Sequence, residues 1–189
     1  MKKYELLKDD TIEVAGKTLF RIKALISFKD IRKGEIGGYV EAERNLSQSG
    51  NAWVSGNAWV TGNAWVCDDA CVTGNAWVCD DAWVSGNAWV CDDAWVSGNA
   101  CVTGNAWVCD DAWVSGNAWV ETSNDYIVFK NNWSSFRWFT YTKSNKMWRV
   151  GCFYGTGDEL IKEAYADSEE SGRKYELYVN LVKELYRDE

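Results

Sequence analysis

A six-residue repeat sets the strongest limit on what this chain can fold into. From Asn51 to Thr122 the sequence runs without interruption through twelve hexads such as NAWVSG, NAWVCD and DAWVSG. Four residues of each hexad alternate as in a strand. The two that follow, Gly-Asn or Asp-Asp, suit a sharp corner because these residue types tolerate a left-handed backbone. The repeat therefore predicts a solenoid in which every hexad contributes one short strand.

The alternation within a hexad also predicts where its side chains point. Successive side chains of a strand lie on opposite faces, so Ala and Val share one face, and Trp shares the other with Ser, Thr or Cys. Small Ala and branched Val suit a narrow, dry interior, whereas an indole in almost every hexad is too large for it. We therefore expect Val and Ala inside the solenoid and the indoles on its outer walls.

The order V-S-G-N-A-W resembles the motif of the hexapeptide-repeat, left-handed β-helix family. That motif places an aliphatic residue, a small residue, two corner residues, a small residue and a variable residue in this order. The family folds three hexads into each triangular coil. The resemblance therefore implies a mainly β chain whose hexads form about four left-handed coils, each rising roughly 4.8 Å.

A flat coil of two hexads is the alternative, because NAWVCDDAWVSG is itself a twelve-residue unit. Such a coil would stack three acidic corners on one edge, and like charges placed side by side in a sheet repel. These corners are Asp68-Asp69, Asp80-Asp81 and Asp92-Asp93. A coil of three hexads spreads the acidic corners over three edges and stacks only Asp92-Asp93 and Asp110-Asp111. The charge pattern therefore favours the triangular coil.

Three hexads per coil would arrange the tryptophans in three outer columns, because residues 18 positions apart then lie above one another. The first ladder contains Trp59, Trp77, Trp95 and Trp113. The second ladder contains Trp53, Trp89 and Trp107 and is interrupted by Cys71. The third ladder contains Trp65, Trp83 and Trp119 and is interrupted by Cys101. Stacked indoles stabilise a thin solenoid by roughly 0.5–1.5 kcal/mol per pair, and contiguous exposed apolar surface marks an interface. The sequence is compatible with both roles, and the ladders are the candidate binding residues.

The cysteines are candidates for metal or redox chemistry, but their distribution argues against both. Cys67, Cys79, Cys91 and Cys109 occupy the slot that Ser or Thr fills in other hexads. Zinc requires four converging ligands, and only Cys91 and Cys109 share a column rung to rung, where oxidation would crosslink them. We expect the thiols to be small outward-facing fillers, and we expect Cys152, in an apolar run, to lie in a core.

The stacked corners Asp92, Asp93, Asp110 and Asp111 form a predicted acidic edge. Three interpretations stay open. The corners reflect the duplication of two sequence cassettes, they bind a hard cation such as Ca²⁺, or they meet a basic protein surface. Apart from this weak candidate, the sequence predicts no metal site and no cofactor.

The segments around the hexads predict three units: an N-terminal cap over residues 1–44, the repeat over 45–122 and a C-terminal α+β domain over 123–189. In the cap, TIEVAGKTLFRIKALISF alternates as strands around a turn at Gly16. In the last unit, DYIVFK, FRWFTYTK and MWRVGCF predict three antiparallel strands. Two helices follow, the first opened by a capping box of Thr156 and Glu159 and the second beginning near Gly172.

Three segments outside the regular hexads carry a second resemblance: TLFRIKAL, GGYVEAERNLSQSGNAWV and GCFYGTGDEL. Their arrangement is similar to that of a group of small phage and prophage proteins. The resemblance covers nearly the whole chain. It implies this layout and a bacterial host, and it implies no activity.

Composition narrows the function further. The best-known members of the hexapeptide family are acyltransferases, with carbonic anhydrase relatives, and they use His as a base or metal ligand. This chain contains no His, so we expect it not to be an enzyme. Its net charge of −8 disfavours direct contact with nucleic acid or an anionic membrane. The lack of a signal peptide and of an apolar run of about 18 residues predicts a cytoplasmic location.

We expect a non-catalytic protein that engages and inhibits a host macromolecule, such as a defence or nucleic-acid-processing factor, with an acidic, Trp-lined rod. Pentapeptide-repeat solenoids that imitate DNA provide an analogy of shape. Two alternatives stay open. One is a structural or assembly protein whose Trp faces pair copies into a dimer or trimer, and the other is a degenerate hexapeptide acyltransferase.

Overall fold

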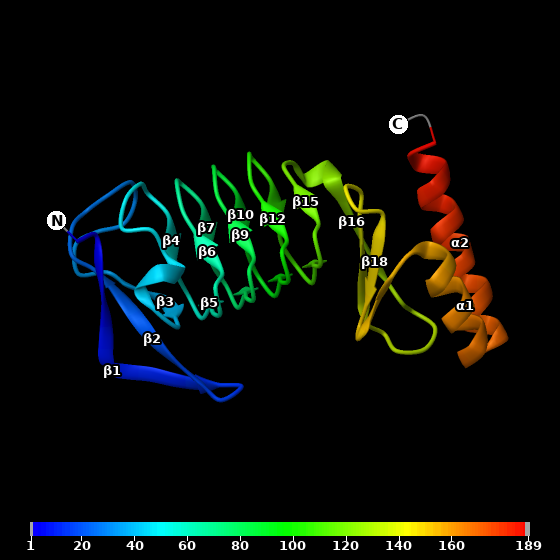
Figure 1. The fold of residues 1–189 in the computed structure, drawn as a ribbon, viewed down its shortest axis with the longest axis horizontal. Helices are drawn as coiled ribbons and strands as arrows, with labels where there is room; N and C mark the ends of the chain where they lie inside the picture. Colours follow the sequence, from blue (N-terminus) through cyan, green and yellow to red (C-terminus); the bar gives the residue numbers. More distant parts are fainter. Residues whose placement is uncertain (1, 188–189) are drawn as a thin grey trace.

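A computed structural model describes residues 2–187, and their central part is a parallel β-solenoid with a smaller unit at each end (Figure 1). Each hexad contributes a two-residue strand, Trp-Val or Cys-Val. Each strand pairs in parallel with the strand 18 residues away, as Trp59 does with Trp77. This period is the one that a coil of three hexads requires, and it excludes the flat coil of two hexads.

Three sheets form the walls of the solenoid, their hexad strands all parallel, and each carries one tryptophan ladder; the first of them also continues into the N-terminal unit. The first-ladder sheet contains β5 (Trp59–Val60), β8 (Trp77–Val78), β11 (Trp95–Val96) and β14 (Trp113–Val114). The second-ladder sheet contains β4 (Trp53–Val54), β7 (Cys71–Val72), β10 (Trp89–Val90) and β13 (Trp107–Val108). The third-ladder sheet contains β6 (Trp65–Val66), β9 (Trp83–Val84), β12 (Cys101–Val102) and β15 (Trp119–Val120).

The solenoid has about five turns, whereas the hexads alone predict about four. The additional turn lies before the hexads. There, β3 (Ile36–Val40) pairs in parallel with β5, and Leu46 forms a bridge to Val66. The IGGYV sequence of β3 lacks the hexad pattern, so the repeat alone does not reveal this turn.

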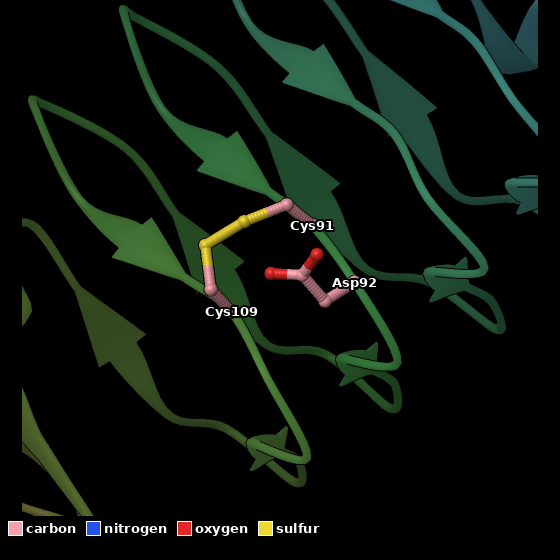
Figure 2. A group of neighbouring side chains, drawn as sticks. All are labelled: Cys91, Asp92 and Cys109. Carbon is pink, nitrogen blue, oxygen red and sulfur yellow. A yellow bond between two sulfur atoms is a disulfide. The ribbon is translucent and has the colours of Figure 1, made fainter.

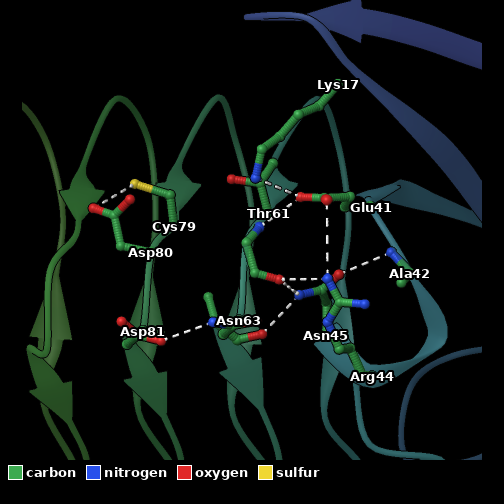
Figure 3. Close-up of polar contacts among 12 residues, drawn as sticks. Lys17, Glu41, Ala42, Arg44, Asn45, Thr61, Asn63, Cys79, Asp80 and Asp81 are labelled. Carbon is green, nitrogen blue, oxygen red and sulfur yellow. Dashed lines mark hydrogen bonds and ion pairs between the residues drawn. The ribbon is translucent and has the colours of Figure 1, made fainter.

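Polar side chains fasten this first turn to the hexads that follow (Figure 3). Asn45 donates its side-chain N–H groups to the carbonyls of Gly62 and Ala64 at 3.1 and 2.8 Å. The Glu41 carboxylate accepts from the Gly62 N–H at 2.7 Å and forms an ion pair with Lys17 at 2.9 Å. The contacts of Asn45 and Glu41 satisfy backbone groups of the first hexads, on the side where the neighbouring turn lacks the repeat pattern.

The interior of the solenoid consists of the Val and Ala side chains of the hexads, all of which are 0–1% exposed. The predicted direction of these side chains is therefore confirmed. Each buried Val stabilises the fold by roughly 1.5–3 kcal/mol. The corners turn in the left-handed region, with φ of 65° at Gly56 and 59° at Asp68. Asp can replace Gly at this position because it tolerates that conformation.

The N-terminal unit closes one end of the solenoid. Strands β1 (Tyr4–Val14) and β2 (Lys17–Ala24) form an antiparallel hairpin around Gly16, as predicted, and β2 also pairs with β3. Lys3 is 1% exposed and donates from Nζ to the carbonyl of Ala52 at 2.8 Å. Tyr4 donates its hydroxyl to the carbonyl of Leu46 at 2.7 Å. Burial lowers the pKa of Lys3 to about 8.

The C-terminal unit has one strand more than the three that the sequence predicts. A four-stranded antiparallel sheet contains β16 (Tyr126–Lys130), β17 (Trp138–Thr142), β18 (Met147–Val150) and β19 (Phe153–Gly155). The run MWRVGCF was predicted as one strand, but Gly151 has a φ of 58° and turns the chain within it. The expectation of a buried Cys152 is wrong for the same reason, because Cys152 is exposed in this turn.

Two helices complete the C-terminal unit, α1 (Gly157–Asp167) and α2 (Glu169–Leu185). The predicted capping box is present. Thr156 Oγ1 accepts from the Glu159 N–H at 3.3 Å, and the Glu159 carboxylate accepts from the Thr156 N–H at 2.8 Å. The helices pack on the sheet around Phe139, Trp148 and Val179 and form a core separate from that of the solenoid. No helix within residues 2–187 has the length and apolarity to cross a bilayer.

Candidate functional site

The first ladder forms a packed column of indoles on its sheet. Trp77 and Trp95 stack with ring centroids 4.6 Å apart, and Trp95 and Trp113 stack at 4.3 Å. Trp59 meets Trp77 edge to face at 5.6 Å. Each of these rings is half-buried. The C-terminal unit covers the end of the column, because the Arg149 guanidinium lies 3.9 Å from the centre of the Trp113 ring. This ladder therefore stabilises the solenoid more than it exposes a surface.

Several indole N–H groups bond to the Ser/Thr/Cys slot of the preceding turn. The N–H of Trp95 donates to Cys79 Sγ at 3.2 Å, and that of Trp83 donates to Cys67 Sγ at 3.2 Å. The two thiols are only 5–6% exposed, and burial raises the pKa of Cys79 to about 11. These cysteines face outward as predicted, but they are covered hydrogen-bond acceptors for the ladders rather than fillers.

The second and third ladders carry the exposed indoles. Exposed fractions range from 38% for Trp89 to 56% for Trp107. The full set is Trp65, Trp83, Trp89, Trp107 and Trp119. Trp89 and Trp107 stack with ring centroids 5.4 Å apart, and Trp65 and Trp83 stack at 5.6 Å.

Trp53 does not belong to the exposed outer wall that the sequence predicts for it. It is 3% exposed, because Phe28 and Tyr4 of the N-terminal unit pack against it at ring distances of 5.5 and 6.4 Å. The repeat alone gives no sign of this cover. The apolar run that contains Phe28 provides the one hint in the sequence, since a cap must bury its apolar residues against the first coil.

Asparagines of one turn donate hydrogen bonds to acidic corners of the next turn. Asn63 Nδ2 donates to Asp81 Oδ1 at 3.0 Å (Figure 3), and Asn75 makes the same bond to Asp93. The spacing of 18 residues between these partners is visible in the sequence once the coil length is known. These hydrogen bonds between an Asn and the Asp 18 residues later also help to fix the register between turns.

The acidic edge lies at the corner between the second-ladder and first-ladder sheets, since its residues connect β10 to β11 and β13 to β14. Burial, and then the carboxylates of Asp93 and Asp110, raise the pKa of Asp111. Asp93 and Asp111 also line a hollow of about 580 Å³ beside the C-terminal unit, together with Trp95 and Trp138. Arg137 also lines this hollow, and Lys130 Nζ lies 4.8 Å from the centre of the Trp138 ring, so cations of this chain already lie beside its carboxylates and aromatic rings.

Asp92 lies beside a cysteine pair rather than in a set of four aspartates. Cys91 and Cys109 occupy neighbouring rungs with Cα atoms 4.6 Å apart and form a disulfide, with Asp92 next to it (Figure 2). Ligand atoms of these three residues lie within 4.8 Å of one another. After reduction, two thiolates and one carboxylate would provide three of the four ligands that zinc prefers. This trio is the set within residues 2–187 that is best placed to hold a metal ion.

One comparison with known proteins bears on the repeat. A family model described as the YdcK β-solenoid repeat matches residues 94–110. Together with the parallel sheets, this match supports a repeat β-solenoid protein. No curated protein sequence matches the chain.

Proposed function

We propose that this chain is a non-catalytic binding protein of the phage or prophage type, active in the cytoplasm of a bacterial host. In this proposal the solenoid is a triangular left-handed β-helix of the hexapeptide kind. It engages a basic host protein, such as a defence or nucleic-acid-binding factor, and inhibits it by covering its functional surface. The proposal includes no catalytic residue and no cofactor, in line with the expectation from the sequence.

One observation carries this proposal: the exposed indoles of the second ladder lie next to the acidic edge. Trp89 and Trp107 belong to β10 and β13, and the corners Asp92-Asp93 and Asp110-Asp111 follow these strands directly. Trp is enriched among the residues that contribute most to binding at interfaces. Carboxylates beside it would steer a basic partner and fix its orientation.

The hollow lined by Asp93 and Asp111 gives the partner a specific anchoring point. An Arg or Lys side chain that enters it would meet two carboxylates and the 40% exposed Trp138, where it would compete with Arg137 and Lys130 of this chain. Burial is the largest cause of the raised pKa of Asp111, and binding of a cation would relieve the second cause, the repulsion from Asp93 and Asp110. The rigid solenoid loses little conformational freedom on binding, which lowers the entropic cost of association.

Self-association is the competing use of the same indoles. A net charge of −8 on every copy opposes it, because identical acidic edges would approach one another in a symmetric assembly. Size-exclusion chromatography with light scattering decides between the two. A monomer with accessible indoles supports the binding protein, and a closed dimer or trimer with covered second-ladder indoles contradicts it.

Capture from a bacterial lysate with matched variants tests the surface itself. The double variant Trp89→Ser/Trp107→Ser removes the second-ladder indoles, and Asp93→Asn/Asp111→Asn removes charge from the hollow. Trp65→Ser/Trp83→Ser removes two equally exposed indoles from the third ladder and is the control. We expect a basic protein that is retained by the native chain and the control, lost with both test variants and released by salt. Equal retention by all four proteins would contradict the proposal.

A further inference from the structure

A cavity lies in the second-ladder sheet at the point where the ladder lacks an indole. Cys71 pairs in register with Trp53 on one side and with Trp89 on the other, so it occupies a rung that holds Trp elsewhere in the column. A thiol is much smaller than an indole. A cavity of about 200 Å³ remains there, and Cys71, Trp53 and Trp89 all line it.

The dimensions of the cavity fit one planar ring. Trp53 and Trp89 lie two rungs apart, and each rung spans about 4.8 Å. Intact stacked pairs of the first ladder have centroid distances of 4.3–4.6 Å, so a single ring between the two indoles lies at stacking distance from both. A cavity of about 150 Å³ holds benzene in an engineered protein. The available volume therefore admits an aromatic ring of the size of an indole.

The Trp53 ring lines this cavity, but its N–H group does not open into it. Trp53 is 3% exposed, and its Nε1 is buried without a hydrogen-bond partner among residues 2–187. The N–H groups of Trp83 and Trp95, by contrast, donate to thiols of the preceding turn. An unpaired buried donor costs about 1–3 kcal/mol. Because a water molecule cannot reach this Nε1, the cavity offers a ligand the ring of Trp53 and not its N–H group.

The charged side chains around the cavity determine which charge on a ligand they favour. Three carboxylates line it, those of Asp30, Glu35 and Asp69, against the single ammonium group of Lys29. Asp69 already accepts from Asn51 at 2.8 Å, whereas Asp30 is exposed at the rim. The excess of negative charge favours a cationic group next to the ring.

We propose that the cavity at Cys71 binds a small aromatic amine, at a site that shares Trp89 with the proposed partner surface but does not include the acidic edge. The ring takes the place of the missing indole between Trp53 and Trp89. The ammonium group of the ligand lies near Asp30, at the rim of the cavity. No covalent step is involved.

Filling the cavity with the protein's own side chain tests this proposal. Isothermal titration with 5-hydroxytryptamine is compared for the native chain, Cys71→Trp and Cys101→Trp. Both substitutions restore an indole to an interrupted ladder, but Cys101 is not among the residues that line this cavity. We expect Cys71→Trp to weaken binding at least about tenfold, which is 1.4 kcal/mol, and Cys101→Trp to bind as the native chain does.

Two further measurements test whether the charge of the ligand matters and whether the variants are folded. Indole-3-acetate has the same ring and the opposite charge, and we expect it to bind at least about tenfold more weakly than 5-hydroxytryptamine. Cys71→Leu is a second filling variant, and circular dichroism shows whether each variant is folded. The proposal is overturned if the native chain binds no amine, if folded Cys71→Trp or Cys71→Leu binds it as tightly as the native chain, or if the anion binds equally well.

Discussion

Replacing Trp95 by Ala should destabilise the protein more than replacing Trp107 by Ala. Trp95 lies between two stacked neighbours, at 4.6 Å from Trp77 and 4.3 Å from Trp113, with interplanar angles of 10° and 9°. Its N–H also donates to Cys79. Trp107 stacks on Trp89 at 5.4 Å and is 56% exposed. Both substitutions remove a tryptophan, so the difference between their costs measures what the position within a continuous, half-buried ladder contributes.

The magnitude follows from these contacts. A stacked aromatic pair contributes about 0.5–1.5 kcal/mol beyond burial, and a hydrogen bond contributes about 0.5–1.5 kcal/mol. Trp95 takes part in two stacked pairs and donates one hydrogen bond, so Trp95→Ala should lower the free energy of unfolding by about 1.5–4.5 kcal/mol. Trp107 takes part in one stacked pair, so Trp107→Ala should cost about 1 kcal/mol.

Equilibrium urea unfolding measures this difference. The transition is followed by far-ultraviolet circular dichroism, because removing an indole changes the fluorescence signal itself. Solenoids can unfold in steps, so the hydrodynamic radius is followed over the same urea series to test for a single transition. A double-mutant cycle of Trp77→Ala and Trp95→Ala should give a coupling of about 0.5–1.5 kcal/mol. Equal costs for Trp95→Ala and Trp107→Ala, or no coupling in the cycle, would refute the stacking argument.

Three other predictions concern the ends and the crosslink. The pKa of Lys3 is about 8 in the folded protein, against a reference value of 10.5. Between these pH values the unfolded chain binds more protons than the folded one, so the free energy of unfolding should rise with pH. Urea unfolding at several pH values should show no such rise for Lys3→Met, and the same slope in both proteins would contradict the argument. Thr156→Ala should cost about 1 kcal/mol through loss of the helix cap, measured by thermal unfolding against an exposed Ser135→Ala control. A reductant should destabilise the native chain by about 2–4 kcal/mol through the loss of the Cys91–Cys109 crosslink, and Cys91→Ser should not respond.

The interior of the solenoid could be predicted because it depends on local pattern alone. Alternation directs every hexad Val and Ala inward, and all of them are buried. The capping box at Thr156 is likewise a short-range signal. The thiols that accept indole N–H groups were missed, although the spacing of 16 residues between Cys79 and Trp95 follows from a period of 18 minus a strand step of two.

The features that the sequence did not reveal depend on contacts between distant segments. Trp53 is identical in its hexad to the exposed indoles, and only the position of Phe28 above it buries the ring. Likewise, the cavity beside Cys71 exists because residues of the N-terminal unit stand over a missing rung. Neither arrangement changes the periodic pattern of the hexads, so the repeat alone does not reveal it.

The C-terminal unit docks on the last two hexads of the rod. The backbone N–H of Trp113 donates to Thr140 Oγ1 at 2.9 Å, and the backbone N–H of Trp119 donates to Ser144 Oγ at 2.7 Å. Because both hexads directly precede this unit, inserting one hexad earlier in the rod would keep the two contacts and would turn the C-terminal unit by one wall relative to the N-terminal unit. Inserting three hexads would restore the relative orientation of the two ends, so a change of 18 residues would alter only the distance between them.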